Sequence, residues 1–268
     1  MKCTSTDLKD WQSKVVERAV SPRKVVEIAV VGKYIGLQDA YKSIYESLVH
    51  AGIYNDTKVV VHKIDSEDIE KDGSSKFLKG LSGVLIPGGF GYRGIEGKKA
   101  AIKFARENNI PFLGLCLGMQ CAVIEFARNV CGLKKANSSE FYKRTPHPVI
   151  SLLAEQKNIR DMGGTMRLGA YPCRVKKGTL AYRIYKKALI SERHRHRYEF
   201  NNKYRKILEK KGIILSGVYP KKDLVEMVEI KDHPFFIAVQ FHPEFKSKPD
   251  RPHPLFREFI TASLKKAK

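Results

Sequence analysis

Gly114-Leu115-Cys116-Leu117-Gly118-Met119-Gln120 is the stretch that decides the fold, because it places one cysteine between a strand and a helix. Residues 110–115 form a short apolar run that predicts a buried strand, and residues 117–130 carry apolar side chains at helical spacing. Such a turn lifts Cys116 out of the sheet and directs the first N–H groups of the helix at whatever the sulfur attacks. The helix N-terminus also favours the thiolate, which is the nucleophilic form. The alternative for an isolated cysteine is a buried structural residue.

A second motif, Gln240-Phe241-His242-Pro243-Glu244-Phe245, follows an apolar run over residues 234–239 that predicts another short strand. One residue separates His242 from Glu244, so in an extended segment both side chains point to the same side. A histidine oriented by a carboxylate is the base half of a Cys-His-acid triad. A lone His-x-Glu pair is also typical of a protein surface, and the Cys116 turn is what favours the catalytic interpretation.

A third motif, Val84-Leu-Ile-Pro-Gly-Gly-Phe-Gly91, runs from an apolar strand directly into a Gly-Gly turn. Backbone N–H groups at Gly88 and Gly89 can approach a ligand there without obstruction by side chains. Beside Cys116, such a turn is suited to hold an oxyanion, which lowers the barrier to acyl transfer. The alternative is an ordinary loop between a strand and a helix.

Strands alternate with helices in the first half of the chain, which favours an α/β fold with a mostly parallel central sheet flanked by helices. Strands are expected at residues 24–31, 58–64, 81–87 and 112–115, and helices at 39–50, 98–108 and 117–130. The Gly-Gly turn and Cys116 then both lie at the carboxyl ends of strands, where open α/β sheets bind ligands.

The pattern changes from Ser139 onward, where short apolar runs predict an added region of antiparallel strands. These runs cover residues 212–218 and 224–230, after which residues 234–239 return to the catalytic edge. A helix over residues 254–267 is expected to close the fold.

Three such motifs in this order resemble the class I, triad-type glutamine amidotransferases. Further runs narrow the resemblance to the glutaminase domain of the CTP synthases, and it covers nearly the whole chain from about Asp7. These runs are Ala29-Val-Val-Gly-Lys-Tyr34, Asp39-Ala-Tyr-Lys-Ser43, Pro87-Gly-Gly-Phe-Gly-Tyr-Arg-Gly94, Phe104-Ala-Arg-Glu-Asn-Asn-Ile-Pro111, Asn137-Ser-Ser-Glu140, Met162-Gly-Gly-Thr-Met-Arg-Leu-Gly169 and Glu192-Arg-His-Arg-His-Arg-Tyr-Glu-Phe-Asn201. The resemblance implies a three-layer, flavodoxin-like arrangement.

The resemblance also implies a mechanism. Cys116 attacks the side-chain amide of L-glutamine, His242 shuttles the proton, and Glu244 orients His242. Backbone N–H groups at Gly89 and Leu117 cradle the oxyanion, ammonia leaves, and water hydrolyses the γ-glutamyl thioester.

The resemblance further implies which residues bind glutamine. Glu140 suits its α-ammonium group and Arg197 its α-carboxylate, as charge complementarity demands. Residues 162–169, with three glycines, look like a lid loop over the site. The full set of implied substrate-binding residues is Gly89, Leu117, Gly118, Met119, Gln120, Glu140 and Arg197.

Members of the resembled family also carry an N-terminal synthetase domain that binds UTP, ATP and magnesium and consumes the ammonia. This sequence has no Gly-x-x-x-x-Gly-Lys-Ser/Thr phosphate loop. Residues 1–22 resemble the end of a linker helix, and residues 23–268 the glutaminase domain. We therefore expect a glutaminase half, excised or separately encoded, with no cofactor or metal of its own, and with GTP as a possible activator. CTP production would need a synthetase partner, and the full-length form is expected to be a homo-oligomer.

The composition leaves one rival class open. Fifty Lys and Arg against 28 Asp and Glu give a formal charge of +22, which is the best support for nucleic-acid binding. The basic residues scatter as short pairs near expected helix ends and turns, without an RNA-recognition signature, so nucleic acid is not the expected partner. Arg193-His-Arg-His-Arg197 is another candidate, for a metal site, but its three arginines would repel a cation. We interpret it as a strand edge that turns Arg197 into the pocket.

Cysteine use and hydropathy favour a cytoplasmic protein. The five cysteines form no Cys-x-x-Cys pair, which suits a reducing compartment and argues against zinc. No apolar run is long enough to span a bilayer. Two alternatives to the amidotransferase interpretation stay open: a stand-alone hydrolase of γ-glutamyl compounds, and a non-catalytic regulatory or filament-building module.

Overall fold

The computed structural model describes residues 8–152 and 166–267, and a nine-stranded sheet runs through its centre. The strand order is β2-β1-β3-β4-β12-β11-β10-β7-β8. The first five strands in that order are parallel: β2 (Thr57–Asp65), β1 (Lys24–Gly32), β3 (Gly83–Ile86), β4 (Phe112–Leu115) and β12 (Phe236–Val239). The mostly parallel sheet predicted from the first half of the chain is confirmed.

The other four strands extend the same sheet in antiparallel pairing, as the second half of the sequence predicts. They are β11 (Leu224–Ile230), β10 (Ile213–Tyr219), β7 (Arg167–Val175) and β8 (Leu189–His196). The expectation that residues 193–197 form a strand edge is confirmed for residues 193–196, since β8 is the last strand in the order, and Arg197 directly follows its end. A second sheet, which the pattern did not predict, joins β5 (Ala136–Ser138), β6 (His147–Ser151) and β9 (Glu199–Phe200).

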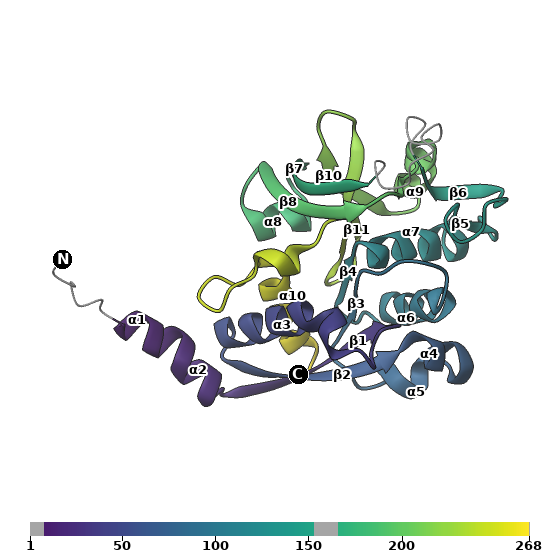
Figure 1. Ribbon diagram of the computed structural model, residues 1–268. Helices are drawn as coiled ribbons and strands as arrows, with labels where there is room; N and C mark the ends of the chain where they lie inside the picture. Colours follow the sequence, from purple (N-terminus) through teal and green to yellow (C-terminus); the bar gives the residue numbers. More distant parts are fainter. Residues whose placement is uncertain (1–7, 153–165, 268) are drawn as a thin grey trace.

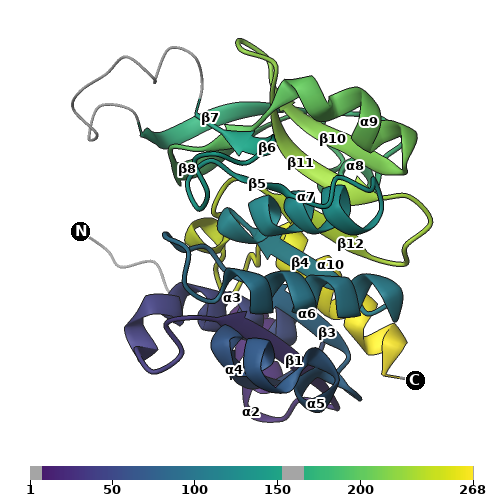
Figure 2. The same cartoon turned by 90° about the vertical axis from the view of Figure 1, so that its right-hand side faces the viewer.

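Helices cover both faces of the parallel strands, which gives the three layers (Figures 1 and 2). On one face, α3 (Lys42–Tyr54), α8 (Leu180–Tyr185) and α10 (Pro254–Lys266) pack through apolar side chains such as Leu48 and Phe256. On the other face lie α6 (Ile95–Glu107) and α7 (Leu117–Asn129), with α4 (Ser66–Asp72), α5 (Ser74–Leu78) and α9 (Arg205–Lys210). Each apolar core therefore lies between a helical layer and the sheet.

The predicted end of the first long helix is wrong. We expected it to end before Ala51-Gly52, but α3 continues to Tyr54. Ala51 and Ile53 are buried, so packing outweighs the low helix propensity of Gly52. A Cβ atom at Gly52 would lie 2.6 Å from the Thr57 carbonyl oxygen, which shows that the glycine is there to let β2 approach the helix.

The N-terminal segment is helical and projects from the body of the domain (Figure 1). It consists of α1 (Lys9–Trp11), a π-helical turn (Gln12–Val16) and α2 (Glu17–Val20). The Arg18 guanidinium donates to the Tyr54 carbonyl oxygen at 3.2 Å, which ties α2 to the end of α3. That residues 1–22 lead to another domain stays a prediction.

The three sequence motifs meet at one edge of the sheet. β3, β4 and β12 are neighbouring parallel strands, so their carboxyl ends lie together. The Gly88-Gly89 turn follows β3, Cys116 follows β4, and His242 comes shortly after β12. Topology thus brings together residues that are up to 154 positions apart in the sequence (242 − 88).

Candidate active site

Cys116 forms the strand-to-helix turn that its flanking glycines predict. Its backbone has φ 50° and ψ −99°, a left-handed conformation that is unusual for a residue with a side chain, and it caps α7. Its N–H donates to the Val239 carbonyl oxygen at 2.7 Å, which fixes the turn to β12. A Cβ atom at Gly118 would lie only 2.3 Å from the Ile86 carbonyl oxygen, so α7 can start this close to β3 only with glycine at that position.

His242 and Glu244 are joined by a hydrogen bond of 2.7 Å between His242 Nδ1 and Glu244 Oε1. The expected extended segment is wrong: Glu244 lies in a 3₁₀ turn, Pro243–Lys246, with proline in its first position. The turn, rather than the alternation of a strand, brings the carboxylate back to the ring. His242 N–H also donates to the Arg193 carbonyl oxygen at 2.8 Å, which anchors His242 to β8.

The second ring nitrogen, His242 Nε2, is buried and has no hydrogen-bond partner among the residues that the structure describes. Burial opposes a charge on the ring. The negative charge of a Cys116 thiolate and the hydrogen-bonded Glu244 carboxylate outweigh that cost and raise the pKa of His242 to about 10. At neutral pH the ring of His242 is therefore an imidazolium, which can give up its Nε2 proton.

Cys116 lies where two cavities meet. One has a volume of about 40 Å³ and is lined by Gly89, Phe90, Cys116, Gln120, Glu140, His196, Arg197 and Tyr198. The other, of about 220 Å³, shares Gly89, Phe90 and Cys116 and is also lined by His242 and Glu244. The sulfur is thus bordered by His242 in the larger cavity and, on the other side, by the smaller cavity, which we call the polar cleft.

The polar cleft is lined by one carboxyl group, of Glu140, and one guanidinium, of Arg197. Glu140 Oε1 accepts from the Gly91 N–H at 3.0 Å. Burial raises the pKa of Glu140, although the Gly91 hydrogen bond and the charges of Lys33 and Arg197 work against that shift. Arg197 Nε is buried without a hydrogen-bond partner among the described residues, so its guanidinium is available to an anion.

The remaining predicted substrate residues are placed around the start of α7. Gln120 lines the cleft, and Leu117, Gly118 and Met119 form the buried first turn of the helix. A Cβ atom at Gly89 would lie 3.2 Å from Leu117 Cδ2, so the two expected oxyanion residues are in contact across the site. Their roles toward a ligand stay predictions.

A comparison with protein-family models now decides the family. The model for the class I glutamine amidotransferases ("Glutamine amidotransferase class-I") matches residues 36–262. The chain belongs to the class I glutamine amidotransferases. It is therefore an enzyme chain of the amidotransferase type, and the sequence resemblance is confirmed.

Solved and curated relatives place this amidotransferase with the glutaminase domain of CTP synthases. The Trypanosoma brucei CTPS glutaminase domain with bound acivicin is 42% identical, with a TM-score of 0.85, and the match covers 90% of this chain and 94% of that one. CTP synthase of Caldanaerobacter subterraneus subsp. tengcongensis is 60% identical over 259 residues, and that of Carboxydothermus hydrogenoformans is 59% identical over 265. These matches cover 97% and 99% of this chain but 48% and 49% of the relatives, so the chain spans about half their length.

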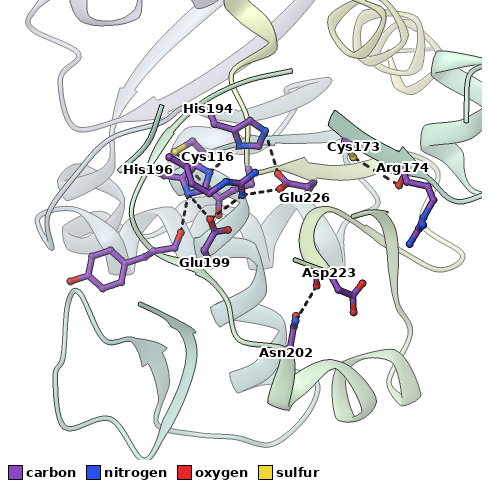
Figure 3. Close-up of polar contacts among 12 residues, drawn as sticks. Cys116, Cys173, Arg174, His194, His196, Glu199, Asn202, Asp223 and Glu226 are labelled. Atoms are coloured by element: carbon purple, nitrogen blue, oxygen red, sulfur yellow. Dashed lines mark hydrogen bonds and ion pairs between the residues drawn. The ribbon is translucent and has the colours of Figure 1, made fainter. Parts of the chain in front are cut away.

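The amidotransferase site has a buried charged cluster behind it that sequence reasoning missed. Arg167 Nη1 lies 3.0 Å from Glu199 Oε1 and 2.8 Å from Glu226 Oε1. His194 Nδ1 lies 3.0 Å from His196 Nε2, and Figure 3 shows this cluster beside Cys116. The alternation of arginine and histidine over residues 193–197 was the sequence signal that could have revealed it, since β8 buries both histidines.

The histidines and carboxyls of this cluster have pKa values far from their usual ranges. Burial lowers the pKa of His194 to about 2 and that of His196 to about 3, and the charge of Arg167 acts in the same direction. Burial also raises the pKa of Glu199 to about 8 and that of Glu226 to about 7, against the pull of Arg167. Both rings are therefore neutral at pH 7.

Two further expectations concern regions around the amidotransferase site. Residues 162–165 of the expected lid lie outside the described residues, whereas Arg167, Leu168 and Gly169 begin β7. In residues 8–152 and 166–267, no group of three or more His, Cys, Asp or Glu side chains is arranged to hold a metal ion. Over the same residues, no helix is long and apolar enough to cross a membrane.

Proposed function

We propose that this chain hydrolyses L-glutamine to glutamate and ammonia through a triad of Cys116, His242 and Glu244. The observation that carries the proposal is the buried 2.7 Å bond between His242 and Glu244, while the other ring nitrogen lies beside Cys116 with no hydrogen-bond partner in the described part of the chain. A carboxylate on Nδ1 fixes the tautomer and leaves Nε2 for proton transfer. The raised pKa of His242 supports a protonated ring that can give a proton to the leaving group.

The chemistry proceeds in two halves. The Cys116 thiolate attacks the side-chain carbonyl carbon of glutamine, and the negative charge moves to the carbonyl oxygen. His242 Nε2 gives its proton to the amide nitrogen and the C–N bond breaks. Ammonia departs, and a γ-glutamyl thioester remains on Cys116. Water then gives a proton to Nε2 and attacks the thioester carbon, the C–S bond breaks, and glutamate leaves with the thiolate restored.

We assign the oxyanion to backbone N–H groups at Gly89 and Leu117. Gly89 follows the carboxyl end of β3, and Leu117 is the first residue of α7, whose N–H has no partner within the helix. Gly89 lines both cavities that reach Cys116, and Leu117 directly follows Cys116, which supports one binding position for both groups. Donors fixed before the reaction stabilise the tetrahedral intermediate without having to reorganise.

We assign the two ends of the amino acid to the polar cleft. Glu140 pairs with the α-ammonium group and Arg197 with the α-carboxylate, since both line the cleft that reaches Cys116. Gln120, Gly118 and Met119 complete the site at the start of α7. This pair of opposite charges fits a substrate whose α-ammonium and α-carboxylate groups are both free, which holds for glutamine and equally for γ-glutamyl compounds.

We propose that the ammonia is used by a synthetase half to convert UTP to CTP. The relatives named CTP synthase are about twice as long as this chain, which supports a partner domain or subunit. UTP, ATP and magnesium belong to that half, GTP is the expected activator, and the assembled enzyme is expected to be a homo-oligomer.

Glutamate release from L-glutamine by the purified chain tests the proposal. The chain should release glutamate, and Cys116→Ser should abolish the release. Cys131→Ser is the matched control, because Cys131 is a half-buried thiol whose Sγ donates to Ile207 instead. Equal activity of Cys116→Ser and the unmodified chain would refute the assigned nucleophile.

A further inference from the structure

Gln240 lies against the sulfur of Cys116 but has no part in the triad. Its side chain is fully buried, and Gln240 Nε2 is 3.6 Å from Cys116 Sγ. Its backbone N–H donates to the Glu226 carbonyl oxygen at 2.9 Å, which fixes the residue beyond the end of β12. A buried amide in this place has lost its hydration, so it must be held by the groups around it.

A backbone carbonyl determines which end of the Gln240 amide faces the sulfur. The Tyr198 carbonyl oxygen can only accept, so the Gln120 atom 3.1 Å away must be the nitrogen. The same Gln120 nitrogen lies 3.2 Å from the Gln240 side chain, which must therefore present its oxygen. The Gln240 atom that is left is the N–H donor, and it points at Cys116.

The direction of these hydrogen bonds has two chemical consequences. A fixed N–H donor at the sulfur stabilises the negative thiolate more than the neutral thiol. Gln120 donates one N–H to the Tyr198 carbonyl oxygen and the other to the Gln240 side-chain oxygen. Gln120 therefore presents only its own carbonyl oxygen to a ligand in the cleft. A carbonyl oxygen suits N–H donors of glutamine.

Other groups that act on the sulfur are also known from the structure. The Cys116 thiol is 3.9 Å from the Arg195 carbonyl oxygen, which can accept from the thiol but offers nothing to the thiolate. The titratable and charged side chains that line the two cavities with Cys116 are Glu140, His196, Arg197 and Tyr198 on one side and Tyr34, Tyr41, Arg195, His242 and Glu244 on the other. Among the described contacts of the sulfur, Gln240 is the neutral side chain that donates a hydrogen bond to it.

We propose that Gln240 is a positioning residue that holds and stabilises the Cys116 thiolate, with its orientation set by the Tyr198 carbonyl through Gln120. This inference rests on the proposed function, because it assumes that Cys116 reacts as a thiolate. It concerns the reactivity of the free enzyme, so it can be tested without turnover.

The test is the rate at which iodoacetamide alkylates Cys116, measured by peptide mass spectrometry from pH 5 to pH 10. Gln240→Met keeps the size of the side chain but removes the donor, and should move the pH midpoint of alkylation up by about one unit, or slow the reaction about tenfold at neutral pH. Gln240→Glu keeps the bond from Gln120 and places a negative charge near the sulfur, so it should move the midpoint further. Gln120→Met should shift it in the same direction without touching the sulfur.

The matched control is Gln12→Met, the same substitution at an exposed helical position, which should leave the profile unchanged. Circular dichroism checks the fold of each variant, and Gln240→Glu replaces Gln240→Met if the latter does not fold. A folded Gln240→Met with the wild-type profile would overturn the proposal. A shift in Gln240→Met without one in Gln120→Met would overturn the part that runs through Gln120.

Failure of the underlying function has a different result. If Cys116 of the unmodified chain reacts no faster at neutral pH than Cys131, whose pKa burial raises to about 11, the thiolate itself is absent and the proposed function fails. A fast Cys116 in the unmodified chain with an unchanged Gln240→Met rejects the role of Gln240 alone.

Discussion

Gly88 lies so close to the ring of His242 that a Cβ atom at position 88 would be 2.9 Å from His242 Cε1 and 3.6 Å from Cys116 Cβ. The ring cannot yield freely, because Glu244 holds its Nδ1 and the Arg193 carbonyl holds its backbone. The first glycine of the turn is therefore needed for the close approach of His242 to Cys116.

Gly88→Ala should displace His242 by several tenths of an ångström and lower kcat for glutamine hydrolysis about tenfold to a hundredfold, with a smaller change in KM. Steady-state kinetics measure the effect. Gly36→Ala is the control, since a Cβ atom there meets nothing within 4 Å. Unchanged kcat in Gly88→Ala would contradict the contact as a functional constraint.

Much of the parallel half of the fold was predictable from local pattern. Strands such as β4 are short apolar runs bounded by glycine or proline, and the turn at Cys116 is marked by Gly114 and Gly118. The end of α3 was not predictable, because the burial of Ala51 and Ile53 depends on packing against distant elements.

The meeting of Cys116, His242 and Glu244 at one site was predictable, but the residues packed around them were not. Cys116, His242 and Glu244 carry recognisable chemistry, whereas Gln240 and the buried histidines of β8 gain their roles only from neighbours far along the chain. The 3₁₀ turn at Glu244 was also missed, since His-x-Glu spacing suits both an extended strand and a tight turn.

Glu244→Gln should lower kcat on the order of a thousandfold. The amide cannot stabilise the imidazolium and can present its NH₂ to Nδ1, which favours the wrong tautomer. The raised pKa of His242 should fall, so the pH profile of kcat should change as well as its height. Glu17→Gln, at an exposed helical position, should match the unmodified chain in both respects. Retention of full activity by Glu244→Gln would exclude it as the orienting acid.

Glu140→Gln should raise KM for glutamine about tenfold to a hundredfold, because a buried contact with the α-ammonium group is lost. Glutaramate, which lacks the α-amino group, distinguishes this from a general defect: the unmodified chain and Glu140→Gln should use it with similar kinetics. Glu46→Gln is an exposed control. A variant that is impaired equally on both substrates would argue against an ammonium contact.

Folding stability should fall in acid because of His194 and His196. Their pKa values are about 2 and about 3 in the folded chain, below the usual 6.5, so only the unfolded chain binds protons as the pH falls below about 6.5. His194→Gln should reduce the slope of unfolding free energy by about 1.4 kcal/mol per pH unit between pH 6 and pH 4. The carboxyls of Glu199 and Glu226 have raised pKa values and act with the opposite sign from about pH 4.5 to 8.

Glu199 and Glu226 are present in both the unmodified chain and His194→Gln. The difference between the two slopes of unfolding free energy against pH, measured by urea denaturation, therefore isolates the contribution of His194. The comparison uses slopes and not absolute stability, so loss of packing in His194→Gln does not affect it. Parallel slopes for the two proteins would mean that His194 is protonated in the folded state.

Covalent labelling by a glutamine-mimicking diazoketone is the most direct test of the central claim, that Cys116 is a nucleophile served by His242. The reagent needs both a proton donor and a thiolate, so peptide mapping should find the label on Cys116, with loss of nitrogen, with protection by excess glutamine and with much slower labelling in Glu244→Gln. A folded chain that stays unlabelled, or is labelled only at Cys131, would contradict the account.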